Sequence, residues 1–355
     1  MSLTLTVDGD RWRTHLRAVA AAHPGLVPVV KGNGYGFGLH RLARRAAWLG
    51  VDTIAVGTYE ELPEVATRFD GDLLVLTPWR PFGAALELEP ALARRVVHTV
   101  GRTEDLAGLL DRDPDARFVL ERLTSMRRHG FSAPGLREAA DLLRARGFSE
   151  GDRRLRGVAL HLPLTRGEHL PEVHRLLDNV VAAGLGTPTV WVSHLTDAEL
   201  VSLATSHADF GFRPRIGTAL WLGDRGALRV TATVLDVHRL ARGDVYGYRA
   251  RHAARGGHLL VVSGGTAHGI GLESPTGEGS LRSRAGTVAR GGLDAVGVVR
   301  SPFTVDGKPR LFAEPPHMQA SMLLLPEGAA VPAVGDEVDV RVRFTATQFD
   351  RVVVT

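Results

Sequence analysis

A lysine followed by a glycine-rich loop is the clearest chemical feature of this sequence. The apolar run over residues 27–30 is typical of a buried strand, Lys31 stands at its end, and glycines recur from there to residue 38. Burial disfavours the ammonium form, so an amine held in such a place can be nucleophilic near neutral pH and can form a Schiff base with an aldehyde. Lys31 is therefore our first candidate for catalysis, and a lysine that only extends its charged end from a core into solvent is the alternative.

The elements that would position Lys31 alternate between strand-like apolar runs and segments of helical periodicity. We expect eight strands, the first ending at Lys31 and the others over residues 53–56, 73–76, 96–100, 118–120, 158–160, 190–192 and 212–216. The clearest helical segments are 39–49, 59–69, 134–146 and 172–183. Eight such alternations predict an α/β fold with a (β/α)8 TIM barrel over residues 10–223, in which chemistry gathers at the carboxyl ends of the strands.

Beyond Trp221 the sequence changes to β-branched runs separated by Gly, Pro and Asp, with hardly any helical pattern. Strands are expected over residues 229–240, 245–250, 259–263, 295–299, 322–325 and 338–344. Residues 224–355 are therefore predicted to form a C-terminal β domain, which residues 1–9 join through an N-terminal strand. The arginine- and glycine-rich segment 282–292 is predicted to be a surface loop.

Composition limits the classes of function. The 355 residues carry a formal charge of +4, with 43 Lys and Arg against 39 Asp and Glu spread along the chain, so we expect no nucleic-acid partner. The chain has no cysteine, which excludes thiol catalysis and cysteine-based zinc sites, and we predict no metal. Neither a signal peptide nor a run of 18 apolar residues occurs, so we expect a cytoplasmic protein without membrane association.

The segment over residues 31–38, Lys-Gly-Asn-Gly-Tyr-Gly-Phe-Gly, closely resembles the cofactor-binding segment of the alanine racemase family of fold-type III pyridoxal-phosphate enzymes. In that family the lysine ends the first barrel strand, and the resemblance implies that Lys31 binds pyridoxal 5′-phosphate. A nucleotide- or phosphate-binding loop is the other interpretation, but the glycine spacing does not match Gly-x-Gly-x-x-Gly.

Three later residues match family positions around the cofactor ring. Arg128 matches the arginine that contacts the phenolic oxygen and the substrate carboxylate, and His161 matches the histidine beside the pyridine ring. Arg215 stands for the arginine on the pyridine nitrogen. Taken singly, such a histidine is more often a satisfied core residue, and such an arginine a member of a surface salt bridge.

Four residues match, or stand near, the family's phosphate-binding positions. Tyr35, four residues after the lysine, corresponds to the tyrosine that contacts the phosphate. Thr196 could cap a helix or bind phosphate at its start. The backbone amides of Gly217 and Thr218 would complete the site, after strands seven and eight, where barrels commonly bind phosphate.

Racemisation also needs a second acid/base group facing the lysine, because a proton leaves one face of the carbanion and returns on the other. Residues 242–248, Arg-Gly-Asp-Val-Tyr-Gly-Tyr, resemble the family segment with the catalytic tyrosine; ungapped alignment places it at Tyr248, with Tyr246 as the alternative. In the family, the β domain of one subunit closes the barrel of the other. The resemblance thus implies a homodimer with shared active sites, in which Tyr248 and the substrate-binding Met318 reach the partner's cofactor.

The sequence departs from the family in places. Glu121 replaces a lysine that many relatives carbamylate, and it could supply a carboxylate directly. Residues 264–269 lack the tyrosine that narrows the entrance, and residues 316–319 keep Met318 but lose the family's aspartate and arginine. A shifted substrate or a lost activity would each produce this pattern.

The resemblance implies an amino-acid racemase acting on a small-molecule amino acid with Lys31 and Tyr248 as its two bases. The alternative is a noncatalytic pyridoxal-phosphate-binding or regulatory protein of the same fold. An amino-acid decarboxylase is a third hypothesis, but those enzymes usually use a β-domain cysteine, which this chain lacks.

Overall fold

The computed structural model describes residues 2–164, 168–271 and 299–355. The chain divides into two compact units. One comprises Thr14–Gly34 and Gly38–Gly223, and the other comprises Met1–Arg13, Tyr35–Phe37 and Asp224–Thr355.

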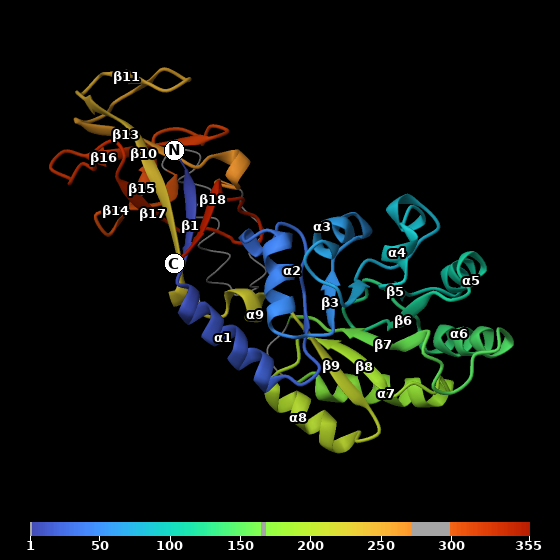
Figure 1. Cartoon of the computed structure of the whole chain (residues 1–355). Coiled ribbons are helices and arrows are strands. Elements are labelled where there is room, and N and C mark those ends of the chain that lie inside the picture. Colours follow the sequence, from blue (N-terminus) through green and yellow to red (C-terminus); the bar gives the residue numbers. More distant parts are fainter. Residues whose placement is uncertain (1, 165–167, 272–298) are drawn as a thin grey trace. The chain divides into compact units, whose positions relative to one another are not determined.

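The first unit is a parallel eight-stranded barrel with helices around it (Figure 1). Its strands lie in the order β2-β9-β8-β7-β6-β5-β4-β3. Their bounds are β2 Val27–Pro28, β3 Thr53–Val56, β4 Asp72–Val75, β5 Val96–Val100, β6 Arg117–Arg122, β7 Leu155–His161, β8 Thr189–Ser193 and β9 Gly211–Ile216. The sheet closes where Val29 bridges Ala55 in parallel and the Val30 N–H donates to the Ala55 carbonyl at 2.7 Å. The predicted (β/α)8 barrel and its eight strands are confirmed.

One apolar side chain from almost every strand fills the barrel, because inward-facing residues alternate with outward-facing ones along each strand. The interior cluster consists of Val27, Val29, Ala55, Leu74, Val97, Val119, Ala159 and Trp191, and all are buried.

In the described part of the chain, the α-helices are α1 Gly9–Ala22, α2 Leu39–Trp48, α3 Leu62–Ala66, α4 Pro90–Ala93, α5 Thr103–Arg112, α6 Ala133–Ala145, α7 Leu170–Ala183, α8 Asp197–Ser206 and α9 Thr218–Leu222. The predicted helix over 59–69 is shorter than expected: a 3-10 turn, η2 (Tyr59–Glu61), precedes α3. Pro63 lacks an N–H and is favoured in the first turn of a helix, which places the α-helical start beside it. None of the helices within the described ranges is long and apolar enough to cross a membrane.

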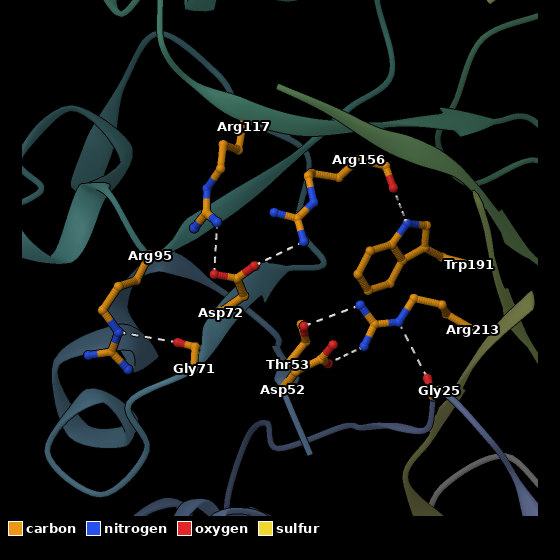
Figure 2. A network of polar contacts seen from close by, with 10 residues as sticks. All are labelled: Gly25, Asp52, Thr53, Gly71, Asp72, Arg95, Arg117, Arg156, Trp191 and Arg213. Atoms are coloured by element: carbon orange, nitrogen blue, oxygen red, sulfur yellow. Dashed lines mark hydrogen bonds and ion pairs between the residues drawn. The ribbon is translucent and has the colours of Figure 1, made fainter. Parts of the chain in front are cut away.

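Ion pairs and hydrogen bonds connect neighbouring strands at the amino-terminal end of the barrel (Figure 2). Asp72, at the start of β4, accepts from Arg117 at 2.8 Å and pairs with Arg156 at 3.2 Å. Arg213, at the start of β9, pairs with Asp52 and lies over the Trp191 ring. Charged residues at this end of a barrel serve stability, because the active site belongs to the opposite end.

The second unit contains an eight-stranded sheet in the order β13-β16-β15-β14-β17-β10-β1-β18, and a further pairing of β13 with β10 closes part of it on itself. Its strands are β1 Leu3–Val7, β10 Leu228–Leu240, β13 Gly257–Ser263, β14 Arg300–Val305, β15 Lys308–Phe312, β16 Ala320–Pro326, β17 Glu337–Val340 and β18 Arg351–Val354. A separate hairpin pairs β11 (Val245–Tyr246) with β12 (Arg251–His252).

The predicted strands over 229–240, 259–263 and 322–325 are confirmed. The predicted strand 245–250 ends at Tyr246, because Gly247 adopts φ +72° and turns the chain. The predicted strand 338–344 likewise ends at Val340. The predicted loop 282–292, and all but the last residue of the predicted strand 295–299, lie outside the described residues.

Candidate active site

Lys31 follows directly on the closure of the barrel. The strand end before it is held from two sides, since the Val29 N–H donates to Ile216 and the Val30 N–H donates to Ala55. The buried Trp221 indole on α9 also donates to the Val29 carbonyl at 2.7 Å. The Lys31 backbone is therefore fixed while its side chain extends at the carboxyl end of the barrel.

The Lys31 amine lies among positive charges. The residue as a whole is exposed, but partial desolvation of its amine lowers its pKa most, followed by Arg128 and Arg215, while Glu61 opposes the shift. An amine with a lowered pKa is uncharged more often near neutral pH, and only the uncharged amine is a nucleophile.

Glu61 holds the loop that follows Lys31, a role that sequence reasoning missed. Its carboxylate accepts from the Gly32 N–H at 2.7 Å and from the Gly57 N–H at 2.6 Å. A Cβ atom on Gly57, the residue after β3, would lie 3.1 Å from the Lys31 Cβ, so a larger residue there would crowd Lys31. The one signal in the sequence is an acidic residue in the first turn of a helix, which ordinarily indicates only a cap.

Arg215 is a fully enclosed guanidinium on β9. It donates to the Ser193 hydroxyl at 3.1 Å and to the Leu160 carbonyl at 3.0 Å, and it lies 3.8 Å from the Glu121 carboxylate. Burial lowers the pKa of Arg215 and raises the pKa of Glu121, and the attraction between them opposes both shifts. A guanidinium keeps its proton in proteins, so β9 presents a fixed positive charge here.

His161 ends β7 next to His194, with the two ring centres 5.0 Å apart. Burial, followed by the charges of Arg215 and Arg128, lowers the pKa of His161 to about 3. The imidazole is therefore neutral at physiological pH. The Thr124 hydroxyl donates to the His161 carbonyl at 2.6 Å and ties the loop after β6 to the end of β7.

Arg128 lies in the loop after β6, near the side chains of Lys31, His161 and Arg215. Its charge contributes to the lowered pKa of Lys31 and of His161, so its guanidinium is close enough to act on both. Lys31, Arg128, His161 and Arg215, which the sequence places far apart, are thus brought together at one end of the barrel.

The residues expected at the phosphate differ in their surroundings. Thr196 caps α8 in a capping box: its hydroxyl donates to Glu199 at 2.9 Å and accepts from the Glu199 N–H at 3.2 Å. The single hydroxyl proton of Thr196 is therefore already used within the protein. Gly217 and Thr218 begin α9, whose start has no side-chain cap.

Tyr35 lies in a 3-10 turn with φ 54°, and it is counted with the second unit. This left-handed conformation is uncommon for a residue other than glycine and often marks a functional position.

Tyr248 and Met318 both belong to the second unit, and their side chains are 86% and 73% exposed. They line one hollow of about 750 Å³. Tyr246 instead packs against a buried cluster that includes Leu240 and Leu259. Within the described residues, no group of His, Cys, Asp and Glu side chains could hold a metal ion.

Comparisons with known proteins agree on one family. The family model for the N-terminal domain of alanine racemase matches residues 7–223. Alanine racemases from Nitratidesulfovibrio vulgaris and Mycolicibacterium vanbaalenii are 27% and 28% identical to this chain, over 72% and 75% of its length and 72% of each relative.

Two solved structures show the same fold. An alanine racemase from Bartonella henselae, with covalently bound pyridoxal phosphate, is 16% identical and covers 100% of both chains with a TM-score of 0.73. A histidine racemase from Leuconostoc mesenteroides is 16% identical and covers 99% of this chain and 98% of its own, with a TM-score of 0.65. Because the family model matches more than half of the chain, the protein belongs to the alanine racemase family.

Proposed function

We propose that the protein is a pyridoxal 5′-phosphate-dependent amino-acid racemase that uses Lys31 and Tyr248 as its two bases. The observation that carries the proposal is the Lys31 amine, whose pKa is lowered, at a barrel end shared with the neutral His161 and the buried Arg215. When bound, pyridoxal phosphate supplies an electron sink that stabilises negative charge at the substrate α-carbon.

The donor set fits this cofactor. Lys31 would hold it covalently, His161 would lie against the ring, and the permanent charge of Arg215 would face the pyridine nitrogen. The amides of Gly217 and Thr218 at the uncapped start of α9 would bind the phosphate together with Tyr35. Thr196 remains a predicted phosphate ligand, which would need its hydroxyl released from Glu199.

The two bases are proposed to act on opposite faces of the α-carbon. Lys31 would take the proton of one enantiomer and Tyr248 that of the other, while Arg128 binds the substrate carboxylate and Met318 contacts the substrate. The exposure of Tyr248 favours it over Tyr246, which packs into an apolar cluster. As in the family, Tyr248 would come from the partner subunit of a homodimer.

The test uses the fact that Lys31 and Lys308 are the two lysines of the chain. We expect chiral chromatography to show racemisation of at least one amino acid from a panel that starts with alanine and serine and includes larger side chains. Lys31→Ala should abolish it, and Lys308→Arg, in an exposed position on β15, should not. Borohydride reduction followed by peptide mass spectrometry should attach the cofactor to Lys31.

Cofactor attachment without any racemisation would favour the noncatalytic pyridoxal-phosphate-binding protein. A protein that takes up no pyridoxal phosphate would contradict the proposed function altogether.

A further inference from the structure

A buried carboxylate lies beneath the proposed catalytic tyrosine. Glu314 is 4% exposed, and one of its oxygens accepts from the Tyr248 backbone N–H at 3.0 Å. Its other oxygen lies 2.7 Å from Nε2 of His317. Burying a carboxylate is costly unless it is hydrogen-bonded, and these two contacts compensate it from both sides.

The turn before Tyr248 is shaped to fit this carboxylate. Gly247 has φ +72°, and a Cβ atom there would lie 2.4 Å from Oε2 of Glu314. The chain can therefore pass over the carboxylate only with glycine between Tyr246 and Tyr248. The position of Tyr248 thus depends on Glu314.

Hydrogen bonds to its backbone and to one ring nitrogen fix the position of His317. Its N–H donates to the Ala320 carbonyl at 2.9 Å, and its carbonyl accepts from Thr266 at 2.8 Å. An ionised carboxylate can only accept, so Nε2 of His317 donates to Glu314 and carries the proton of the neutral ring. Nδ1 makes no hydrogen bond within the described residues and is the nitrogen left to exchange a proton.

The His317 ring also contacts the Tyr248 ring, with centres 4.6 Å apart, and both residues line the same hollow. The other charged residues that line it are Arg249 and Glu314. Histidine is the side chain that exchanges protons most readily near neutral pH, whereas a phenol does so near pH 10. Glu314 orients an imidazole whose ring contacts the Tyr248 phenol ring, and an oriented imidazole can act as a base for a hydroxyl in the same hollow.

We propose that His317, oriented by Glu314, is the proton-relay residue of Tyr248; this inference rests on the proposed function. When the tyrosinate takes a proton from the substrate α-carbon, the phenol passes its proton through solvent in the hollow to Nδ1 of His317, and the resulting imidazolium releases one proton to bulk solvent. In the other direction, the imidazolium donates to the tyrosinate that has just protonated the α-carbon, and solvent restores the imidazolium. Glu314 stays ionised throughout and acts by position.

The first experiment needs neither cofactor nor activity. Of the four tyrosines, Tyr248 can be identified by its loss in Tyr248→Phe, and its ¹³Cζ resonance can be followed against pH in the protein freed of cofactor. We expect a pH-dependent change in this resonance that disappears in His317→Gln. His252→Gln, a change of an exposed histidine in the same unit, is the matched control. Identical Tyr248 curves in the wild type and His317→Gln would overturn the relay.

The second experiment measures solvent deuterium incorporation into each enantiomer by the holoenzyme. Glutamine can still donate to Glu314 but cannot carry a proton, so a purely structural role of His317 predicts wild-type exchange in His317→Gln. The relay predicts a loss of about 10- to 100-fold for the enantiomer deprotonated by Tyr248, with the other within about twofold, and partial rescue by added imidazole. If His317→Gln exchanges each enantiomer at the wild-type rate, the relay is contradicted.

The two hypotheses fail differently. If the wild type exchanges no amino acid, the racemase proposal is wrong, and the Tyr248 resonance still decides whether His317 and Tyr248 are coupled. If the wild type racemises but the variant is unaffected, only the relay is wrong.

Discussion

Charge and burial together decide which side chains at the barrel rim keep their protons. Arg215 retains its charge because a guanidinium does so in proteins, whereas His161 beside it is neutral because burial and two arginines lower its pKa to about 3. A neutral ring can lie against an aromatic cofactor without adding a second charge to the one that Arg215 supplies. At this rim, the uncharged imidazole of His161 therefore lies beside the permanent charges of Arg215 and Arg128.

This neutrality predicts a pH dependence of stability. The pKa of a histidine in the unfolded chain is about 6.5. Between about pH 6.5 and 3, His161 is therefore protonated in the unfolded chain but not in the folded one. His161 should therefore destabilise the fold progressively as the pH falls through that window, by up to about 2 kcal/mol at pH 5, and should have no such effect above it.

The check is urea unfolding of the cofactor-free protein at pH 5.0 and 7.5. His161→Asn should reduce the difference in unfolding free energy between the two pH values, and the same change at the exposed His252 is the control. An unchanged difference in His161→Asn would show that the folded state protonates His161 freely.

The sequence predicts which side chains meet at the barrel rim where strand ends determine their positions. Lys31, His161 and Arg215 each end or lie within a predicted barrel strand, so their convergence follows from the fold. Glu61 was missed because its partners Gly32 and Gly57 come from two different loops, which only the closed barrel brings together. His317 was missed because its contact with Glu314 and Tyr248 depends on the β-domain pairing.

At the scale of elements, the end of β2 is a junction that β9, β3, α9 and η2 support, with β9 accepting from the Val29 N–H through Ile216. β3 accepts a hydrogen bond through Ala55, α9 donates one from Trp221, and the turn η2 clamps the following loop through Glu61. The sequence pattern indicated β2 and β3 well. The pattern was less informative for η2 and α3, because Pro63 places the start of α3 after the 3-10 turn η2.

Glu61→Gln tests this clamp. An amide has one acceptor oxygen and cannot accept well from both Gly32 and Gly57, so one backbone N–H loses its charged partner, and because the Gly32 contact is exposed and water can replace it, the cost is about 1 kcal/mol. We expect pyridoxal-phosphate affinity to fall by about tenfold, because part of the binding energy must then order the loop.

Spectrophotometric titration with pyridoxal phosphate measures the affinity, and Glu60→Gln on the same turn, an exposed neighbour, is the matched control. Equal affinities in Glu61→Gln and Glu60→Gln would mean that the clamp has no part in positioning Lys31.

At the scale of the molecule, the two proposed bases belong to different compact units, and the proposal takes them from different subunits. Lys31→Ala and Tyr248→Phe dimers should each be inactive alone. Dissociating and reassociating an equal mixture should restore about a quarter of the wild-type activity, because half of the dimers are then mixed and each has one intact site.

Sedimentation should show a dimer at micromolar concentration before and after mixing. Absence of any recovery in a mixture shown to contain mixed dimers would contradict shared active sites.

The measurement that tests the central claim most directly is deuterium incorporation at the α-carbon by wild type and Tyr248→Phe in deuterated solvent. The wild type should exchange both enantiomers and interconvert them. In Tyr248→Phe, racemisation should fall by about 10²- to 10⁴-fold, while one enantiomer, deprotonated by Lys31, still exchanges with its configuration retained. Undiminished racemisation by Tyr248→Phe, or no exchange of any amino acid by a wild type that carries pyridoxal phosphate on Lys31, would contradict the central claim.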